Sequence, residues 1–272
     1  MRRIFALSCA TLTITASSAW AQSNPVTLNA TGSDNTYDLI NSVLAGDGNV
    51  VETPDCGHEA FGPHITQIFD ATLNRHVFRF HIHRDHDDDR CRKFDRQRTE
   101  IKIYNRSPEA LKATSGDTFT YSWKFRLHKS FQPSRKFTHL HQIKAVGGSE
   151  SSMPQITFTA RKGRDGAPDR FELRYAKNRK QRTLKWVPLE PFLGQWVAVE
   201  ERITYGENGR FKVQVNSVQS GETLFSYEDA SIRMWKDGAE FLRPKWGIYR
   251  SLKDKGNLKD EVVDFADFRI SY

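Results

Sequence analysis

The feature that most constrains the fold is a series of short segments in which apolar and polar side chains alternate. Between residues 76 and 83, for example, Phe78, Phe80 and Ile82 occupy one set of alternate positions, and Arg79, His81 and His83 occupy the other. A period of two residues places the two sets on opposite faces of a β-strand. From residue 65 onward, similar segments recur at 99–104, 118–127, 138–144, 155–160, 171–175, 196–204, 211–218, 245–249 and 262–270.

Turn-forming residues separate these segments, as at 162–166 and 206–209. The sequence shows no long amphipathic helical window; one short helix is expected at 37–44, and 188–193 is at most a turn. About ten strands without an internal repeat predict an all-β fold, an antiparallel two-sheet β-sandwich of the jelly-roll type with a concave groove, rather than a propeller. Because no linker interrupts the series, we expect residues 22–272 to form a single domain.

The first 21 residues have the composition of a secretory signal peptide. Arg2 and Arg3 precede a mostly apolar stretch at 4–16, and Ala19-Trp20-Ala21 matches a cleavage signal. The apolar stretch is too short for a permanent membrane helix. We therefore expect export to the periplasm or the exterior, with cleavage near Ala21 and no membrane insertion.

Two cysteines, Cys56 and Cys91, remain after removal of this segment. An even pair in an exported chain favours one disulfide, with two unpaired thiols as the alternative. Closing a loop of about 35 residues would stabilise the fold by roughly 3–4 kcal/mol.

The charge distribution points to an anionic partner. The chain carries 41 Lys and Arg against 33 Asp and Glu, a formal charge of +8, of which the signal peptide accounts for two. Residues 161–185 contain ten basic and three acidic side chains, so the excess is local. Such a segment suits the rim of a site for an anionic ligand, or else a strand pair whose cations face water. Export makes nucleic acid an unexpected partner, and a mean hydropathy of −0.65 excludes a polytopic membrane protein.

Three of the predicted strands carry ionisable side chains at alternate positions, which places them on one face of a sheet. Arg98, Glu100 and Lys102 share a face of the first strand, and Lys245, Gly247 and Tyr249 share a face of the third. In the second strand, Gln142 and Lys144 share one face, and His139 and His141 lie on the other. A glycine between two such side chains is expected to leave room for a ligand.

Taken in order, these strands resemble the motifs of jelly-roll polysaccharide lyases. Alginate lyases of polysaccharide lyase family seven carry R-x-E-x-R, Q-I-H and Y-F-K-x-G-x-Y strands, and the corresponding segments here are Arg98-Thr99-Glu100-Ile101-Lys102, Gln142-Ile143-Lys144 and Lys245-Trp246-Gly247-Ile248-Tyr249. The ending Gly247-Ile248-Tyr249-Arg250 is closer to heparin-lyase-like and glucuronan-lyase-like jelly rolls.

The resemblance implies β-elimination on a 1,4-linked uronic-acid polymer, which is glucuronan-, alginate- or heparin-like. Tyr249 would be the proton donor and a candidate base, its pKa lowered by Lys245 and nearby arginines. Arg98 and Gln142 would hold the substrate carboxylate and stabilise the charge that develops on it. The remaining candidate substrate-binding residues are Glu100, Lys102, Lys144, Lys245, Arg250 and His81.

The sequence leaves more than one candidate for the base, because Lys144 stands where family seven has histidine. His83 is the first candidate and His141 the second, with Tyr249 acting alone as the alternative. Strict alternation directs His141 away from Gln142 unless a β-bulge intervenes.

Metal and hydrolase chemistry fit the sequence less well. His81, His83 and His86 lie among Asp85, Asp87, Asp88 and Asp89, but an EF-hand would need Gly at Arg90 and Glu at Arg96. We expect no metal and no cofactor; a structural calcium ion would fit this turn better than zinc. We expect the acidic turn to form ion pairs with the arginines at 90–98.

Glu200 and Glu201 are adjacent and so point to opposite faces, which argues against a pair of glycosidase carboxylates. The rival hypothesis is a monomeric, non-catalytic module for acidic polysaccharide that uses aromatic residues such as Trp123, Trp186, Trp196 and Trp246. Tyr249 within K-x-G-x-Y favours an enzyme, which we also expect to be a monomer.

Overall fold

A computed structural model describes residues 24–33 and 35–272. The predicted signal peptide lies outside these residues. Within them, no helix is long and apolar enough to cross a membrane.

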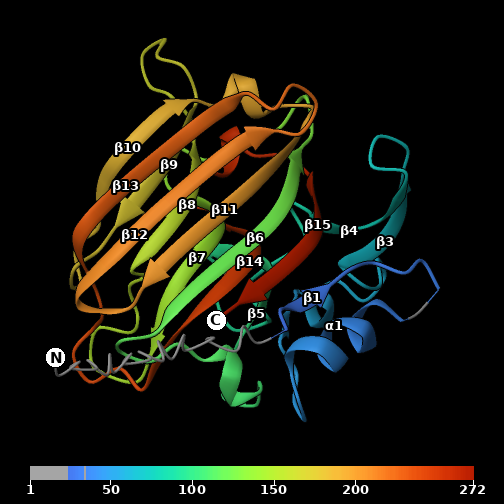
Figure 1. Cartoon of the computed structure of the whole chain (residues 1–272). Coiled ribbons are helices and arrows are strands. Elements are labelled where there is room, and N and C mark those ends of the chain that lie inside the picture. The colour runs from blue at the N-terminus through green and yellow to red at the C-terminus, as the bar shows by residue number, and fades with distance from the viewer. Residues whose placement is uncertain (1–23, 34) are drawn as a thin grey trace, which may run out of the picture.

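Two antiparallel sheets form the body of the protein (Figure 1). The strands of the first sheet are β1 (Val26–Leu28), β3 (Ile65–Asp70), β4 (Arg75–Ile82), β6 (Thr118–Leu127), β11 (Trp196–Thr204), β12 (Gly206–Ser217), β13 (Thr223–Met234) and β15 (Glu261–Ser271). Those of the second sheet are β2 (Val51–Glu52), β5 (Arg96–Lys102), β7 (Thr138–Val146), β8 (Ile156–Arg161), β9 (Arg170–Tyr175), β10 (Arg182–Pro188) and β14 (Phe241–Ser251).

The first sheet has the order β13-β12-β11-β6-β15-β4-β3, with β1 also paired to β15, and the second has the order β10-β9-β8-β7-β14-β5-β2. Strands that are far apart in sequence are therefore neighbours, as β14 is to both β5 and β7. This arrangement confirms the predicted antiparallel β-sandwich.

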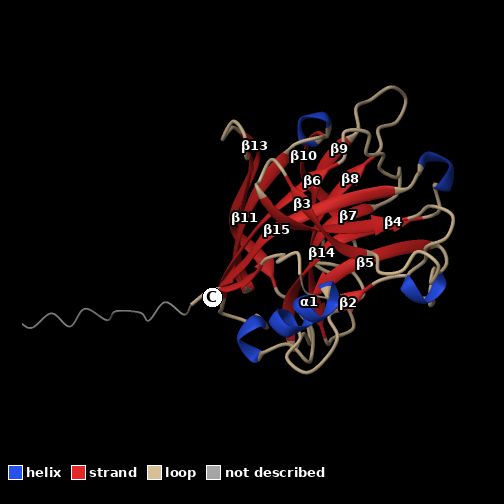
Figure 2. Cartoon of the chain, turned by 90° about the vertical axis from the view of Figure 1, so that its right-hand side faces the viewer, coloured by secondary structure: helices blue, strands red, loops and turns tan. Residues whose placement is uncertain are grey.

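Helical structure is confined to short pieces at the ends of the sandwich (Figure 2). Helix α1 (Thr36–Leu44) matches the predicted helix and begins where the side chain of Asn35 accepts hydrogen bonds from the backbone N–H groups of Tyr37 and Asp38. Short 3-10 helices span Asp55–Gly57, Glu109–Leu111, Glu190–Phe192 and Lys255–Asn257.

The core lies between the sheets and is built by the alternating apolar positions. On β6, every second residue from Phe119 to Leu127 is buried, and on β4 the side chains of Phe78, Phe80 and Ile82 are buried. Trp123, Trp196 and Trp246 are buried as well, whereas Trp186 is exposed. Burial of these large aromatic side chains, together with the buried Ile, Leu and Val residues of the core, supplies the hydrophobic driving force.

Strands β10 and β13 were absent from the sequence prediction. Both are edge strands of their sheets, and most of their side chains are exposed or half-buried. An edge strand that buries little carries polar residues on both faces, so the alternation that identifies the central strands is weak.

The two cysteines form the predicted disulfide, with 6.3 Å between the Cα atoms of Cys56 and Cys91. It joins the segment before β3 to the turn that follows β4.

Candidate active site

The register of β14 against its two neighbours brings the three polar motifs together. Opposite β5, Tyr249 faces Arg98 and Lys245 faces Lys102. Opposite β7, Lys245 faces Gln142. Antiparallel partners point to the same face, so these side chains converge on the surface of the second sheet that faces away from the core.

Glu100 stands at the centre of this surface and is completely buried. Its carboxylate accepts hydrogen bonds from Lys245 Nζ at 2.5 Å, from Arg98 and from Gln142 Nε2. Burial favours the neutral acid, but Lys245 and Arg98 together outweigh it and hold the pKa of Glu100 below its usual value. Glu100 is therefore an anion that neutralises its neighbours.

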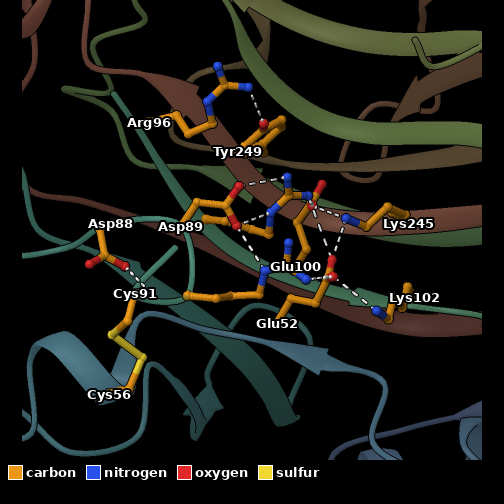
Figure 3. A network of polar contacts seen from close by, with 12 residues as sticks. Glu52, Cys56, Asp88, Asp89, Cys91, Arg96, Glu100, Lys102, Lys245 and Tyr249 are labelled. Carbon is orange, nitrogen blue, oxygen red and sulfur yellow. Dashed lines mark hydrogen bonds and ion pairs between the residues drawn. A yellow bond between two sulfur atoms is a disulfide. The ribbon is translucent and has the colours of Figure 1, made fainter. Parts of the chain in front are cut away.

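A second buried carboxylate comes from Glu52, on the two-residue strand β2. Figure 3 shows it reaching toward Lys102 and Lys245, and its Oε1 accepts a hydrogen bond from Lys102 Nζ at 2.9 Å. Although burial acts in the opposite direction, Lys245, Arg98 and Lys102 hold the pKa of Glu52 well below its usual range. Glu52 was not predicted as a site residue, because a single glutamate in a two-residue strand has no alternating pattern around it.

Arg98 is committed to protein carboxylates. Its Nε and Nη2 donate to Asp89 at 2.8 and 3.1 Å, and its Nη1 donates to Glu100. The guanidinium carbon lies 3.6 Å from the centre of the Tyr249 ring. These contacts place Arg98 where it can position Tyr249, and Gln142 is likewise engaged with Glu100.

Tyr249 is mostly buried between Arg98 and the ring of Phe137, whose centre is 5.0 Å away. Its hydroxyl accepts a hydrogen bond from Arg96 Nη1 at 3.0 Å. Burial raises the pKa of Tyr249, and the opposing effects of Arg98 and Arg96 do not cancel it. The expectation of a lowered pKa was wrong, because desolvation of the phenolate outweighs the nearby cations. Tyr249 carries its proton at neutral pH.

His139, on β7, is the histidine that the fold brings to Tyr249. The two ring centres are 6.0 Å apart, and both residues line one pocket. His139 Nδ1 lies 2.8 Å from Thr159 Oγ1, and its ring stacks on Phe137. Burial, followed by repulsion from Arg161 and other arginines, lowers the pKa of His139 to about 3, so its imidazole is neutral.

Strict alternation would have placed His139 on the core face with His141. The pairing of β7 shifts register against both neighbours between these two residues, which reverses the alternation there. The β-bulge considered for His141 is therefore present, but the histidine that it directs into the groove is His139. His141 points into the core, where its Nε2 lies 3.0 Å from Glu201 Oε2 and its ring packs 4.5 Å from Trp123.

Three other predicted residues lie elsewhere. Arg250 is fully buried, with its Nε donating to Gln97 Oε1 at 2.8 Å. His81 belongs to the first sheet, where its Nε2 lies 3.0 Å from Thr66 Oγ1, and His83 follows the same strand. None of the three is among the residues that line the two pockets described next.

Two adjoining pockets of about 360 and 390 Å³ form a groove on this sheet and share Arg98, Lys144 and Ser152. The first is lined by the cations Arg90, Arg98, Lys102, Lys144, Arg243 and Lys245, with Glu52 and Tyr104. The second is lined by Arg96, Arg98, Lys136, Lys144 and Arg161, with Phe137, His139, Gln142, Gln181 and Tyr249. Among these described lining residues, the second pocket contains no carboxylate.

Among the described residues, three cations of the groove form no ion pair with a carboxylate: Lys136, which is exposed, Lys144 and Arg243. Arg243 is 6% exposed, and its Nε and Nη1 are buried without a hydrogen-bond partner. Lys144 Nζ donates only to the Ser152 carbonyl, at 3.2 Å. Burial, together with neighbouring cations that include Lys245, lowers the pKa of Lys144 to about 7. Arg243 could have been found by extending the alternation of Lys245, Gly247 and Tyr249 by one position toward the N-terminus.

Comparisons with known proteins identify the family of this chain. The family model described as polysaccharide lyase matches residues 72–267. The chain belongs to this family. No curated protein matches the lyase in sequence.

Solved structures of similar shape include three lyases. The endo-β-1,4-glucuronan lyase from the fungus Trichoderma reesei has 15% identity and a TM-score of 0.53, covering 76% of this chain and 86% of its own. The marine alginate lyase from Aplysia kurodai has 11% identity and a TM-score of 0.59, covering 91% and 98%. An alginate lyase from Pseudomonas aeruginosa has 16% identity and a TM-score of 0.50, covering 82% and 96%. At these identities, the likeness establishes the shared fold.

Gly247 of the lyase is required for packing rather than for ligand access. Its φ is +142°, and a Cβ atom built there would lie 2.1 Å from the Thr99 carbonyl oxygen on β5. The expectation that this glycine leaves room for a ligand was wrong, because the backbone of β5 occupies the space.

The basic segment 161–185 forms one end of the groove. Arg161 and Gln181 line the second pocket. Glu172 forms ion pairs with Arg161, Arg170 and Arg174 at 3.4, 3.3 and 2.8 Å. Part of the local charge is therefore balanced within β8 and β9, and the segment acts partly as a rim and partly as an ordinary charged strand pair.

Proposed function

We propose that the lyase is exported and cleaves a 1,4-linked, uronic-acid-containing polysaccharide by β-elimination, with Tyr249 as proton donor. The supporting observation is the buried Arg243 and the half-buried Lys144, both without carboxylate partners among the described residues, in a groove that also holds a protonated tyrosine. Glucuronan lyase and alginate lyases, named for polymers of uronic acids, share the fold.

The sugar carboxylate is recognised by the groove cations that have no carboxylate partner among the described residues. A buried cation is costly without a partner, and a bound carboxylate would remove that cost. Lys144 lines both pockets and so is suited to the sugar next to Tyr249, while Arg243 is suited to the neighbouring sugar. We therefore assign carboxylate binding to Lys144 and Arg243 in place of Arg98 and Gln142. Both of the latter contact Glu100, and Arg98 also packs on the Tyr249 ring.

The elimination requires a base for the C5 proton and an acid for the leaving oxygen. The C5–H bond breaks, its electron pair forms the C4–C5 double bond, and the C4–O4 bond breaks as O4 takes the proton of Tyr249. Arg96, which donates to the Tyr249 hydroxyl at 3.0 Å, stabilises the phenolate left behind. His139, which lines the same pocket as Tyr249 with the two ring centres 6.0 Å apart, is our candidate base in place of His83 and His141. The reaction is redox-neutral and needs no organic cofactor.

The disulfide and the N-terminal sequence support action outside the cytoplasm. Cys56–Cys91 is of the kind that persists in oxidising compartments, and residues 1–21 have the composition of a signal peptide. N-terminal sequencing of the protein released by the native host tests the predicted cleavage near Ala21.

Ultraviolet absorbance of the conjugated uronate product tests the activity on glucuronan, alginate and heparin-like polymers. We expect a rise with at least one polymer, a loss of 10²-fold or more in Tyr249→Phe, and a comparable loss in His139→Asn. Tyr227→Phe, on β13 of the other sheet, is the matched control and should retain full activity. Binding without any absorbance change would identify a binding module, and full activity in Tyr249→Phe would refute the proposed mechanism.

A further inference from the structure

A second cluster of chemically reactive side chains lies outside the groove. His58, His64, His83 and Asp87 each direct one ligand atom to a common point, and these atoms all lie within 4.8 Å of one another. We propose that these four residues bind a zinc ion, which holds together the segment before β3 and the turn after β4.

The distances from the Asp87 carboxylate to the three histidines are close to those of tetrahedral coordination. Asp87 Oδ1 lies 2.8 Å from His58 Nδ1 and 3.1 Å from His64 Nε2, and Asp87 Oδ2 lies 3.2 Å from His83 Nδ1. Ligands bound to zinc at roughly 2.0–2.1 Å are separated by about 3.3 Å along the edges of a tetrahedron. Small side-chain adjustments would therefore complete the site.

A second carboxylate orients one of the imidazoles. Asp55 Oδ1 lies 2.7 Å from His64 Nδ1, and Asp55 Oδ2 accepts a hydrogen bond from the Tyr37 hydroxyl at 2.7 Å. A proton held on His64 Nδ1 by Asp55 leaves Nε2 as the metal-binding atom. Carboxylate–histidine pairs of this kind fix the ring orientation at zinc sites. The side chains of His64 and Asp87 are fully buried, so they are not surface groups that meet by chance.

The donor set selects the metal. Three imidazoles and one carboxylate favour zinc, whereas calcium requires six or more oxygen ligands. The other acidic residues of the turn are engaged elsewhere: Asp88 accepts from the backbone of Cys91 at 2.6 Å, and Asp89 binds Arg98. His58 and His64 are distant in sequence from the acidic turn, so the local pattern that favoured calcium over zinc did not include them.

The position of the cluster indicates a structural role. Gln97, on β5, donates its amide to the backbone carbonyls of His83 and Asp87 at 2.6 and 2.9 Å. Two residues beyond Asp87, Asp89 holds the guanidinium of Arg98. A metal at Asp87 would thus support the turn that positions Arg98, and through it Tyr249, without itself touching substrate.

Metal analysis of the full-length protein tests the proposal independently of lyase activity. We expect about one zinc per chain by mass spectrometry of the purified protein, and tetrahedral Co²⁺ absorption after exchange. Removal of zinc by a chelator should lower the melting temperature, and added zinc should restore it. A wild-type chain that takes up neither Zn²⁺ nor Co²⁺ would overturn the proposal, leaving His64 as a histidine hydrogen-bonded between two carboxylates.

Variants identify the ligands. His58→Ala, at the edge of the cluster, should abolish the Co²⁺ spectrum while near-ultraviolet circular dichroism confirms a folded chain, and Asp55→Asn should weaken zinc binding roughly 10- to 100-fold. His128→Ala, an exposed histidine outside the cluster, is the matched control and should bind zinc normally. Unchanged zinc affinity in His58→Ala and Asp55→Asn would refute the assignment.

Discussion

Replacing Arg243 with methionine should make the fold more stable while weakening the binding of polysaccharide. The guanidinium of Arg243 is buried in the groove, and its Nε and Nη1 have no hydrogen-bond partner. A group in this condition lowers the stability of the free protein and gains its partner only when an anion binds. Methionine keeps much of the unbranched stem and removes the charge.

The magnitude follows from the effect of burial on this group. Burial lowers the pKa of Arg243 from 12.5 to about 10, even though Glu52 and Glu100 act in the opposite direction. At about 1.4 kcal/mol per pH unit, this corresponds to about 3 kcal/mol of lost stability. The loss is present at every pH below about 10, where arginine is protonated in both the folded and the unfolded chain.

Methionine also forfeits the contact between the guanidinium and the ring of Tyr104, 5.0 Å away. That contact contributes about 0.5–1 kcal/mol. The net gain in the free energy of unfolding is therefore about 2 kcal/mol, or roughly 4–8 °C in melting temperature for a domain of this size.

Urea denaturation and the KM for the best polymer measure the two effects in the same protein preparations. Lys212→Met is the matched control, because Lys212 and its partner Glu228 are both more than half exposed on the other sheet. We expect this control to change neither quantity by a measurable amount. A lower free energy of unfolding in Arg243→Met, or an unchanged KM, would refute the reasoning.

Three further predictions concern other parts of the structure. Gly247→Ala should destabilise the fold by several kcal/mol or prevent folding, measured by chemical denaturation, because its Cβ would collide with the Thr99 carbonyl 2.1 Å away; a stable variant would contradict this. KM should rise as the pH increases above 7, because Lys144, whose pKa is lowered to about 7, then loses the positive charge that attracts the uronate. Lys144→Gln should raise KM at low pH and make KM less dependent on pH. A variant with the same pH dependence of KM as the wild type would argue against a role of Lys144 in binding the uronate. Cys56→Ser with Cys91→Ser should cost roughly 3–4 kcal/mol of stability under oxidising conditions, and equal stability of variant and wild type would exclude a stabilising disulfide.

Much of the fold follows from local patterns. The alternation of apolar and polar residues identified the central strands, because a strand whose one face is buried must place an apolar side chain at every second position. The same rule placed Arg98, Glu100 and Lys102 on one face of β5, where they share an ion network in the structure.

The contacts and the protonation of each site residue could not be predicted from these local patterns. Glu52 reaches the ion network from a two-residue strand, and His139 enters the groove only because the register of β7 shifts against both neighbours. A register shift depends on how two paired strands fit together, so it cannot be predicted from the sequence of either strand alone. The raised pKa of Tyr249 likewise depends on the balance between burial and the nearby cations, which is a property of the packed structure.

The amino-acid sequence by itself determined a sandwich of alternating strands, a cationic character, a disulfide and three polar motifs with the spacing of jelly-roll lyases. These are local properties, set by the identity and spacing of neighbouring residues. Only the tertiary structure decided which cations are already paired, which histidine accompanies Tyr249, and that His58 and His64 join His83 and Asp87. Those outcomes depend on contacts between residues far apart in the chain, where desolvation and ion pairing act together and reverse what local pattern predicts.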